Sequence, residues 1–257
     1  MGVLNVTPDS FSDGGLFDDP LRALERAQQI AAEGAQIIDI GGESTRPGAA
    51  SVSLAEELNR VVPVVRAVAR HSKILISVDT SRPEVIEQAV AEGAAMINDV
   101  RSLRSRGALA ALAKTEAAAC LMHMQGEPAT MQLTVHYDDV IGEVRAMLAA
   151  RLSACAEAGI SADRLCLDPG FGFGKLRPHN LQLLRELGEL RVLDRPLMVG
   201  LSRKSLLKEL TGRGKEERLA GSIALATVAV LNGAAIVRAH DVAATVDAVR
   251  VAAALRQ

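Results

Sequence analysis

The sequence predicts an α/β protein, a single closed (β/α)8 barrel that spans residues 1–257, and three features lead to this prediction. Short runs of aliphatic and β-branched residues alternate with longer segments of helical periodicity along the whole chain. Eight such units can be counted. A single domain of about 250 residues is also the usual size of this barrel.

The expected strands are bounded by Gly, Pro, Asp or Ser, and most are continuous apolar runs, which is typical of strands buried on both faces. They are expected at residues 2–6, 36–40, 74–78, 95–98, 118–122, 164–167, 197–201 and 235–238. The helices between them have one apolar side, as Val61, Val65 and Val68 show in the second. A doubly wound sheet of eight strands would need a chain reversal for which the sequence offers no place.

The charge balance argues against nucleic acid and membrane partners. The chain has 29 basic and 31 acidic residues, without a run of like charge. It also lacks a signal peptide pattern and the run of about 18 apolar residues that a membrane span needs. Cys120, Cys155 and Cys166 do not have the spacing of a zinc or redox site. We therefore expect a cytoplasmic protein that acts on small molecules and keeps three reduced cysteines in its core.

Polar residues stand at the ends of nearly all expected strands, where barrel enzymes carry their active sites. They are Asn5, the 41–47 loop, Asp79, Asn98, His123, Asp168, the 202–204 segment and the 238–240 segment. Helix capping explains part of this pattern, and we interpret Ser81 and Asp241 as caps.

Capping does not explain the long cations among these residues. Arg203, Lys204, Arg238 and His240 are not N-cap residues, and we expect them to crowd one another in the absence of an anionic ligand. The sequence therefore predicts a site for an anion.

All four phenylalanines, Phe11, Phe17, Phe171 and Phe173, fall in expected loops outside the predicted core. A flat ring ligand is the natural partner of such residues, although Phe17 can equally anchor its own loop. The glycines of the 170–175 segment have the spacing G-x-G-x-G, which is not the G-x-G-x-x-G of dinucleotide sites. We interpret the segment as a glycine-permitted loop that brings Phe173 over the barrel mouth.

Four segments, residues 5–15, 41–48, 168–175 and 202–205, resemble the signature segments of dihydropteroate synthases, and the resemblance runs almost from end to end. It implies the condensation of 6-hydroxymethyl-7,8-dihydropterin pyrophosphate with p-aminobenzoate, which yields 7,8-dihydropteroate and pyrophosphate in folate biosynthesis. It also implies a homodimer, with the helices between Leu219 and Ala254 as the expected interface. A copy that confers sulfonamide resistance is disfavoured.

The resemblance, together with the chemistry of the side chains, assigns roles to individual residues. A pterin edge presents N–H donors that carboxylates accept, and pyrophosphate suits guanidinium donors. The pterin site is expected to comprise Asp79, Asn98, Met122, Asp168, Phe173, Gly200 and Lys204. The pyrophosphate site is expected to comprise Asn5, Arg46, Arg238 and His240, with Asn5 also holding the cofactor Mg2+. The p-aminobenzoate site is expected to comprise Phe11, Thr45, Arg46, Pro47, Phe173, Lys204 and Ser205.

Catalysis is assigned to Arg46, Lys204, Arg238 and His240, which stabilise the charge on the leaving group and the pterin. Taken alone, Asp79 could be only a helix cap and Met122 only a core residue. Structural roles are expected for His123 and His136.

Two other functions remain open. A methyltetrahydrofolate-dependent methyltransferase shares the pterin-binding barrel, but residues 45–47 and 202–205 argue against it. A non-catalytic pterin-binding homologue, which acts as a regulatory or structural subunit, is disfavoured because the first two loop motifs are intact. Relatives usually carry an extra segment before the first strand, and here Met1 precedes that strand directly. We therefore expect a truncated sequence or a barrel bottom that is closed in another way.

Overall fold

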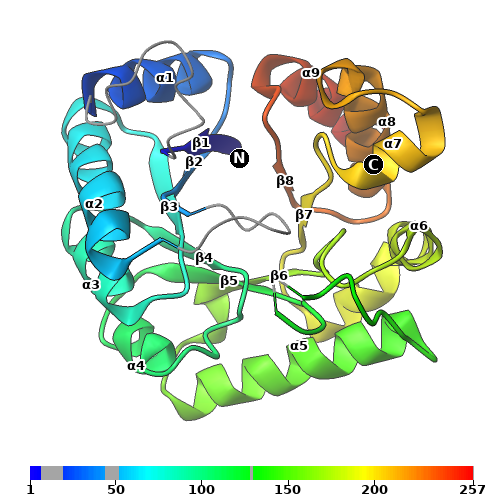
Figure 1. The fold of residues 1–257 in the computed structure, drawn as a ribbon, viewed down its shortest axis with the longest axis horizontal. Helices are drawn as coiled ribbons and strands as arrows, with labels where there is room; N and C mark the ends of the chain where they lie inside the picture. The colour runs from blue at the N-terminus through cyan, green and yellow to red at the C-terminus, as the bar shows by residue number, and fades with distance from the viewer. Residues whose placement is uncertain (7–19, 44–51, 128–129, 257) are drawn as a thin grey trace.

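The computed structural model describes residues 1–6, 20–43, 52–127 and 130–256. In this part of the chain, strands alternate with helices, and the helices form a ring around the strands (Figure 1). The strands are β1 (Gly2–Asn5), β2 (Ile37–Gly41), β3 (Leu75–Asp79), β4 (Met96–Asp99), β5 (Ala118–Met122), β6 (Leu165–Asp168), β7 (Met198–Gly200) and β8 (Ile236–Arg238). All eight expected strands are confirmed, and no strand end differs from its expected position by more than one residue.

Each strand is followed by a helix, and β7 is followed by two. The helices are α1 (Pro20–Ala32), α2 (Leu54–His71), α3 (Pro83–Ala91), α4 (Ala108–Ala113), α5 (Val140–Glu157), α6 (Arg177–Arg185), α7 (Ser205–Thr211), α8 (Leu219–Leu231) and α9 (Val242–Ala254). Helix α2 begins after Ser53, whose side chain accepts a hydrogen bond from the Glu56 N–H, and it buries Val61, Val65 and Val68 as predicted. Within the described residues, no helix is both long and apolar enough to cross a membrane.

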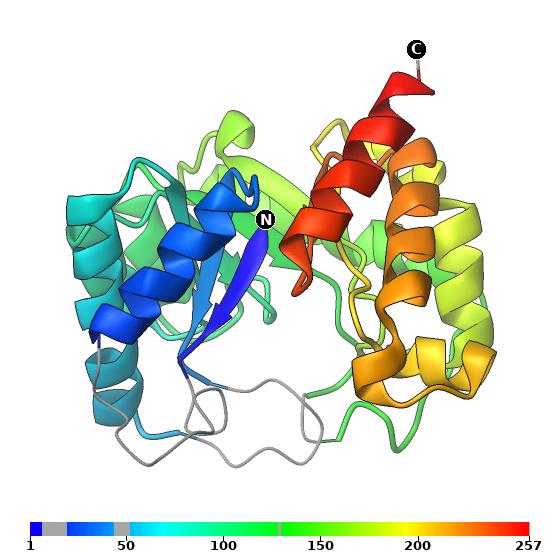
Figure 2. The same cartoon turned by 90° about the horizontal axis from the view of Figure 1, so that it is seen from above.

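The strands close into a barrel. Strands β1 to β6 form one parallel sheet in sequence order, and β7 pairs in parallel with β8. The Leu167 N–H donates to the Pro196 carbonyl at 2.9 Å, which joins β6 to the segment entering β7. The Val3 N–H donates to the Ala239 carbonyl at 3.0 Å, which joins β1 to the end of β8. The strands therefore follow one another in a closed cycle, and the predicted (β/α)8 barrel is confirmed. Figure 2 shows the N-terminus between the first helix, α1 (blue), and the last, α9 (red).

The interior of the barrel is filled by a small sulfur-rich cluster. Met96, Cys120, Cys166 and Met198 pack against one another there, one from each of β4 to β7. The larger core, with Ile38, Ile40 and Ile97 among its members, lies between the strands and the helices. All three cysteines are free and buried, as the sequence predicted. Because side chains alternate along a strand, the residues two positions beyond the interior cluster face the same interior, nearer the carboxyl ends of the strands.

The loop between β6 and α6 requires glycine. Gly170, Gly172 and Gly174 have φ angles of 71°, 80° and 59°, in the left-handed region that other residues rarely adopt. A Cβ atom on Gly170 would lie only 1.8 Å from the carbonyl oxygen of His123. The loop can therefore lie against the backbone after β5 only because its first residue has no side chain, which confirms the interpretation as a glycine-permitted loop.

Gly170→Ala should lower the free energy of unfolding by more than the roughly 1–2 kcal/mol that a left-handed conformation costs alone, because the His123 carbonyl must also shift. Gly159→Ala is the matched control, since Gly159 has a φ of 80° and nothing within 4 Å of its added Cβ. Urea unfolding of both variants measures the difference. Equal losses would contradict the close approach described here.

Candidate functional site

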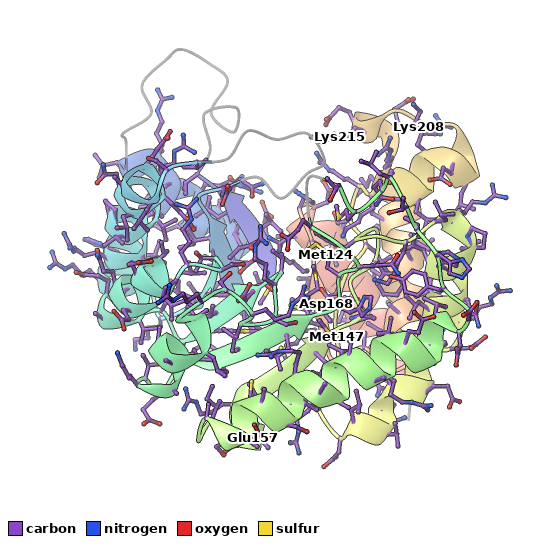
Figure 3. The ribbon with its side chains drawn as sticks, turned by 60° about the horizontal axis from the view of Figure 1, so that its bottom comes forward. Met124, Met147, Glu157, Asp168, Lys208 and Lys215 are labelled. Carbon is purple, nitrogen blue, oxygen red and sulfur yellow. The ribbon has the colours of Figure 1, made fainter. Side chains whose placement is uncertain are left out.

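A polar layer lies at the carboxyl ends of the strands, two residues beyond the sulfur-rich interior cluster. Its members are Asp79 on β3, Asn98 on β4, Met122 on β5, Asp168 on β6, Gly200 on β7 and Arg238 on β8. The strand register places Met122 beside Asp168 and Gly200 beside Arg238. Figure 3 shows Asp168 in the middle of the ring of helices, whereas Glu157 and Lys208 lie out on α5 and α7. The barrel therefore gathers residues that are far apart in sequence at one end of its interior.

Arg238 is held by two carboxylates. Its Nε donates to Asp39 Oδ2 at 2.6 Å, and its Nη2 donates to Asp79 Oδ2 at 3.0 Å. Asp39 is completely buried, and it also accepts hydrogen bonds from Ser77 Oγ at 2.6 Å and from Asn98 Nδ2 at 3.0 Å. Asp39 was not among the predicted site residues. A signal was present, because a carboxylate inside the apolar run at residues 37–40 needs buried partners.

Burial shifts the pKa values of the ligand-facing groups towards neutrality. It raises the pKa of Asp79 to about 7, against the opposing effect of Arg238. It also raises the pKa of Asp168, although the N–H of Gly170 donates to Asp168 Oδ1 at 2.7 Å. It lowers the pKa of Lys204 to about 8, while the nearby Asp168 favours the charged amine. The pKa values of the acceptors Asp79 and Asp168 and of the donor Lys204 therefore move towards the physiological pH range.

Lys204 and Phe173 form one wall beside the polar layer. The Lys204 Nζ lies 4.3 Å from the centre of the Phe173 ring and donates to the Phe171 carbonyl. Phe173 is half-buried and packs against a cluster of Met122, Met124, Met131 and Val100. Its position fits the expectation of a side chain available to a flat ring.

Phe171 does not fit that expectation. Its side chain is only 1 % exposed and belongs to the main core. The prediction that Phe171 lies outside the core was wrong, because the left-handed glycines on either side turn the loop so that this ring points inwards. Only its carbonyl faces Lys204.

Lys175 is a buried anchor that the sequence analysis missed. Its Nζ donates to His123 Nδ1 at 2.8 Å, to the Gly170 carbonyl at 3.0 Å and to the Phe173 carbonyl at 3.1 Å. Burial lowers the pKa of Lys175 to about 7 and that of His123 to about 3, so that His123 stays neutral and accepts. The structural role expected for His123 is confirmed. His136 is exposed and contacts Asp138 at 3.2 Å.

Carboxylates pair with two of the predicted cations. Arg203 donates through Nε to Asp241 at 2.9 Å and through Nη1 to Glu216 at 3.3 Å. The expectation that Arg203 and Arg238 crowd other cations without an anionic ligand was therefore wrong, because the barrel supplies its own anions. His240 lies with its Nδ1 3.1 Å from Ser202 Oγ.

Asp241 stands at the N-cap position of α9, as expected, whereas the N-cap residue of α3 is Arg82 and not Ser81. Asp241 precedes α9 but makes no capping bond with its side chain, which binds Arg203 instead. Ser81 donates to the buried carboxylate of Asp99. Both side chains pair with charged groups that sequence position does not reveal.

Several predicted ligand residues lie at the margin of the site or outside it. Asn5 ends β1, and a Cβ on its strand partner Gly41 would lie 3.7 Å from Asn5 Oδ1 and 3.5 Å from Asp79 Cβ. Asn5 and Asp79 therefore flank Gly41, one on each of the two strands that pair with β2. Ser205 follows Lys204 at the exposed start of α7, and Gly200 has open space beside it. The remaining predictions, Phe11, Phe17, Thr45, Arg46 and Pro47, fall outside the described residues.

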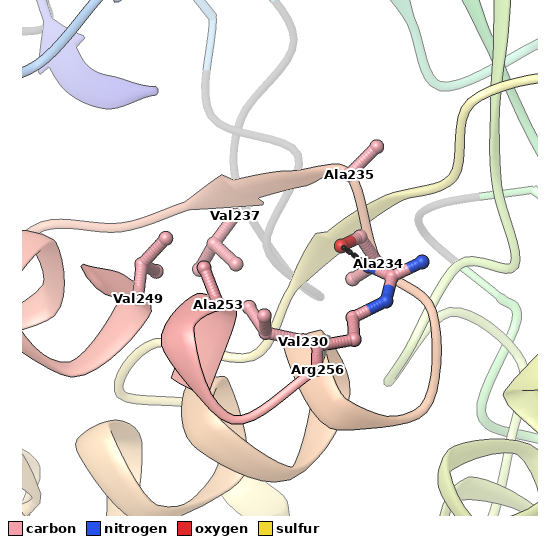
Figure 4. Close-up of a pocket in the computed structure, with 7 residues that line it drawn as sticks. All are labelled: Val230, Ala234, Ala235, Val237, Val249, Ala253 and Arg256. Carbon is pink, nitrogen blue, oxygen red and sulfur yellow. Dashed lines mark hydrogen bonds between the residues drawn. The ribbon is translucent and has the colours of Figure 1, made fainter. Parts of the chain in front are cut away.

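A cavity of about 340 Å³ lies elsewhere, between β8, α8 and α9 (Figure 4). It is lined by Val230, Ala234, Ala235, Val237, Val249, Ala253 and Arg256. Ala234 and Ala235 enter β8, whereas Arg238 ends it, so the cavity lies towards the opposite end of the barrel from the polar layer. The guanidinium of Arg256 donates to the Ala234 carbonyl at 3.2 Å, and the other lining residues are aliphatic. The groups suited to a charged ligand are in the polar layer.

The fold and the polar layer together define a (β/α)8-barrel enzyme with a small-molecule site at the carboxyl ends of its strands. The family described as pterin binding enzyme matches residues 1–240. The chain is 53% identical to the dihydropteroate synthase of Escherichia coli strain K12 over 251 residues, which cover 98% of this chain and 89% of that relative. It is 50% identical to the dihydropteroate synthase of Neisseria meningitidis serogroup B, over 99% of this chain and 92% of that relative.

Solved structures agree with these relatives. The Yersinia pestis dihydropteroate synthase with a sulfonamide drug complex has a TM-score of 0.95 and 50% identity, and the match covers 99% of this chain and 93% of that one. The Xanthomonas albilineans dihydropteroate synthase in complex with 7,8-dihydropteroate has a TM-score of 0.90 and 47% identity, over 99% and 92% of the two chains. The chain belongs to the dihydropteroate synthase family of pterin-binding enzymes.

The predicted pterin contacts need an ionised Asp79 as acceptor and a protonated Lys204 as donor. Affinity for 6-hydroxymethylpterin should therefore be highest between about pH 7 and about pH 8, the pKa values of these two groups. It should fall below this window as Asp79 gains a proton and above it as Lys204 loses one. Calorimetry across the range measures the profile, and Lys204→Arg should remove the loss at high pH. A flat profile would show that these two groups do not contact the pterin.

Proposed function

We propose that the chain condenses 6-hydroxymethyl-7,8-dihydropterin pyrophosphate with p-aminobenzoate. The amine nitrogen of p-aminobenzoate forms a bond to the pterin methylene carbon, and the bond from that carbon to the pyrophosphate oxygen breaks. The amine loses a proton, and the products are 7,8-dihydropteroate and pyrophosphate. The single observation that carries this proposal is the polar layer, in which the buried Asn98 and Asp168 and the partly buried Asp79 lie beside cations that follow β7 and end β8.

The acceptors suit the donor edge of a pterin. Asp168 is 5 % exposed, and the N–H of Gly170 fixes its Oδ1, so that Oδ2 is the atom offered to a ring donor. Asp79 and Asn98 are strand neighbours and extend this polar edge. Phe173 and Met122 supply the apolar contact for the ring face. A flat ring with adjacent N–H groups is the ligand that this combination of side chains recognises.

The cations suit the leaving group. Lys204, Arg238 and His240 can stabilise negative charge on departing pyrophosphate, with Arg46 as a further predicted contributor. The reaction needs no nucleophilic side chain, because the arylamine itself attacks. The carboxylates of Asp79 and Asp168 can stabilise positive charge that develops on the pterin methylene as the pyrophosphate leaves. These assignments favour dissociative chemistry, in which the leaving group departs ahead of the attack.

Magnesium is part of this proposal. Asn5 offers an amide oxygen at the carboxyl end of β1, and Mg2+ prefers oxygen ligands and often shares phosphate oxygens and water. Within the described residues, no group of three or more His, Cys, Asp or Glu side chains could hold a metal ion. Asn5 and the bound pyrophosphate are therefore the proposed ligands. When bound, the ion would neutralise charge on the leaving group.

The assay that tests the function is the release of pyrophosphate with both substrates present. The proposal predicts release that depends on p-aminobenzoate and is accompanied by dihydropteroate. A pterin-binding homologue without activity would bind the pterin pyrophosphate and release nothing. A methyltransferase would instead consume methyltetrahydrofolate. Either of the last two results would reject the proposed reaction.

Asp168→Asn should weaken binding of the pterin pyrophosphate by about 1–3 kcal/mol, or more than tenfold at the upper end, because an amide presents a donor to a ring donor. Asp138→Asn is the matched control, since that carboxylate is 95% exposed. Calorimetry on both variants measures the change. Near wild-type affinity in Asp168→Asn would remove Asp168 from the pterin site.

We also propose a cytoplasmic homodimer. Three buried free cysteines fit a reducing compartment. Helix α8 has no charged residue, and Val228 and Leu231 stand exposed on it at 40% and 43%. Exposed apolar side chains on a helix without charge fit an interface between two copies.

Val228→Glu should shift the protein from dimer to monomer, because it places a charge in this apolar surface. Sedimentation velocity over a range of protein concentrations measures the distribution. Glu157→Gln, on α5, is the control and should leave it unchanged. A dimer of undiminished stability in Val228→Glu would place the interface elsewhere.

A further inference from the structure

Asp39 occupies the centre of the hydrogen-bond network beneath the proposed pterin site. Its Oδ1 accepts from Ser77 Oγ at 2.6 Å. Its Oδ2 accepts from both Arg238 Nε, at 2.6 Å, and Asn98 Nδ2, at 3.0 Å. The side chain is 0% exposed, so it has no contact with solvent. One oxygen atom of a residue outside the predicted site thus holds two side chains that are predicted to bind the ligand.

We propose that Asp39 is a positioning residue that fixes which atoms of Asn98 and Arg238 face the substrate. The inference rests on the proposed function, since it assigns the pterin to Asn98 and the pyrophosphate to Arg238. Asp39 itself does not touch either part of the substrate in this account. It acts through the two side chains that it holds.

The first consequence concerns the amide of Asn98. Its NH2 group is engaged by Asp39, so its oxygen points away from Asp39 and is available as an acceptor. Asp79 and Asp168 are acceptors as well. With Asn98 held by Asp39, all three groups of the polar edge present hydrogen-bond acceptors. These acceptors match the N–H donors of a pterin. An inverted amide would place its own donors against them.

The second consequence concerns the guanidinium of Arg238. Asp39 binds Nε and Asp79 binds Nη2, so carboxylates from two different strands fix one edge of the planar group. Nη1 and the second hydrogen of Nη2 are then the donors left for an anion. A guanidinium held in this way loses little freedom when pyrophosphate binds.

Charge and position predict opposite effects of removing Asp39. A carboxylate close to an anion repels it, so loss of the charge by itself would strengthen pyrophosphate binding. Loss of the positioning contacts would release Arg238 and weaken that binding. The sign of the change in pyrophosphate affinity therefore distinguishes the two effects.

The experiment measures binding of two probes, inorganic pyrophosphate and 6-hydroxymethylpterin, by calorimetry. Asp39→Ala should weaken both by about tenfold or more, because both held side chains lose their common acceptor. Asp39→Asn should restore both to within about threefold of the unaltered protein. Its amide can donate to Ser77 Oγ, which leaves its oxygen in place for Arg238 and Asn98.

Ser77→Ala is the matched control, because it removes a buried hydrogen bond to Asp39 but leaves both contacts of Oδ2. It should bind both probes within about threefold of the unaltered protein. The double variant Asp39→Asn with Ser77→Ala should bind both probes about tenfold more weakly, because the amide loses the partner that orients it. Thermal unfolding checks that each variant is folded. If Asp39→Ala does not fold, the double variant gives the same test.

A folded Asp39→Ala variant that binds pyrophosphate as tightly as the unaltered protein, or more tightly, would overturn the positioning role. So would a double variant that binds like Asp39→Asn alone. Failure of the unaltered protein to bind either probe would overturn the proposed function together with this inference. The first two outcomes leave the proposed function intact, so the two failures can be told apart.

Discussion

The rest of the site depends on two hydrogen bonds, which Arg238 donates to the carboxylates of Asp39 and Asp79. They join the last strand to the second and third, across 199 and 159 residues of sequence. An unpaired charge in this position would be very costly, because the barrel interior offers little water. Arg238 therefore needs its carboxylates, and the buried carboxylates need Arg238. The hydrogen-bond partners of Arg238 are therefore in place before a ligand arrives.

The barrel makes this arrangement possible through register and through glycine. Parallel strands place residues of equal depth side by side, so that Asn98 and Asp168 lie in the layer directly above Met96 and Cys166. The glycines after β6 let the loop lie against the His123 backbone. That loop in turn presents Phe173 to Lys204. The same geometry that closes the barrel thus builds both the acceptor edge and its aromatic wall.

Much of this could be predicted from the sequence. The spacing of apolar residues, the lengths of the segments and the turn residues between them predicted all eight strands. The polar residues at the strand ends predicted where the candidate site lies. Asp39 was missed because its partners lie up to 199 residues away and a strand pattern does not show which side chains meet inside a barrel. Lys175 and Asp241 were missed or misinterpreted for the same reason. Phe171 was placed outside the core because the inward turn of its ring depends on backbone angles.

In the structure described here, two carboxylates fix Arg238 before substrate binds. Nitrogen-15 NMR of the Arg238 Nε–H group in the ligand-free protein tests it most directly. We expect one resonance, shifted downfield and slow to exchange with water, because Nε–H donates to a fully buried carboxylate at 2.6 Å. An averaged resonance that exchanges as fast as that of an exposed arginine would contradict it, because the guanidinium would then be mobile until a ligand orders it.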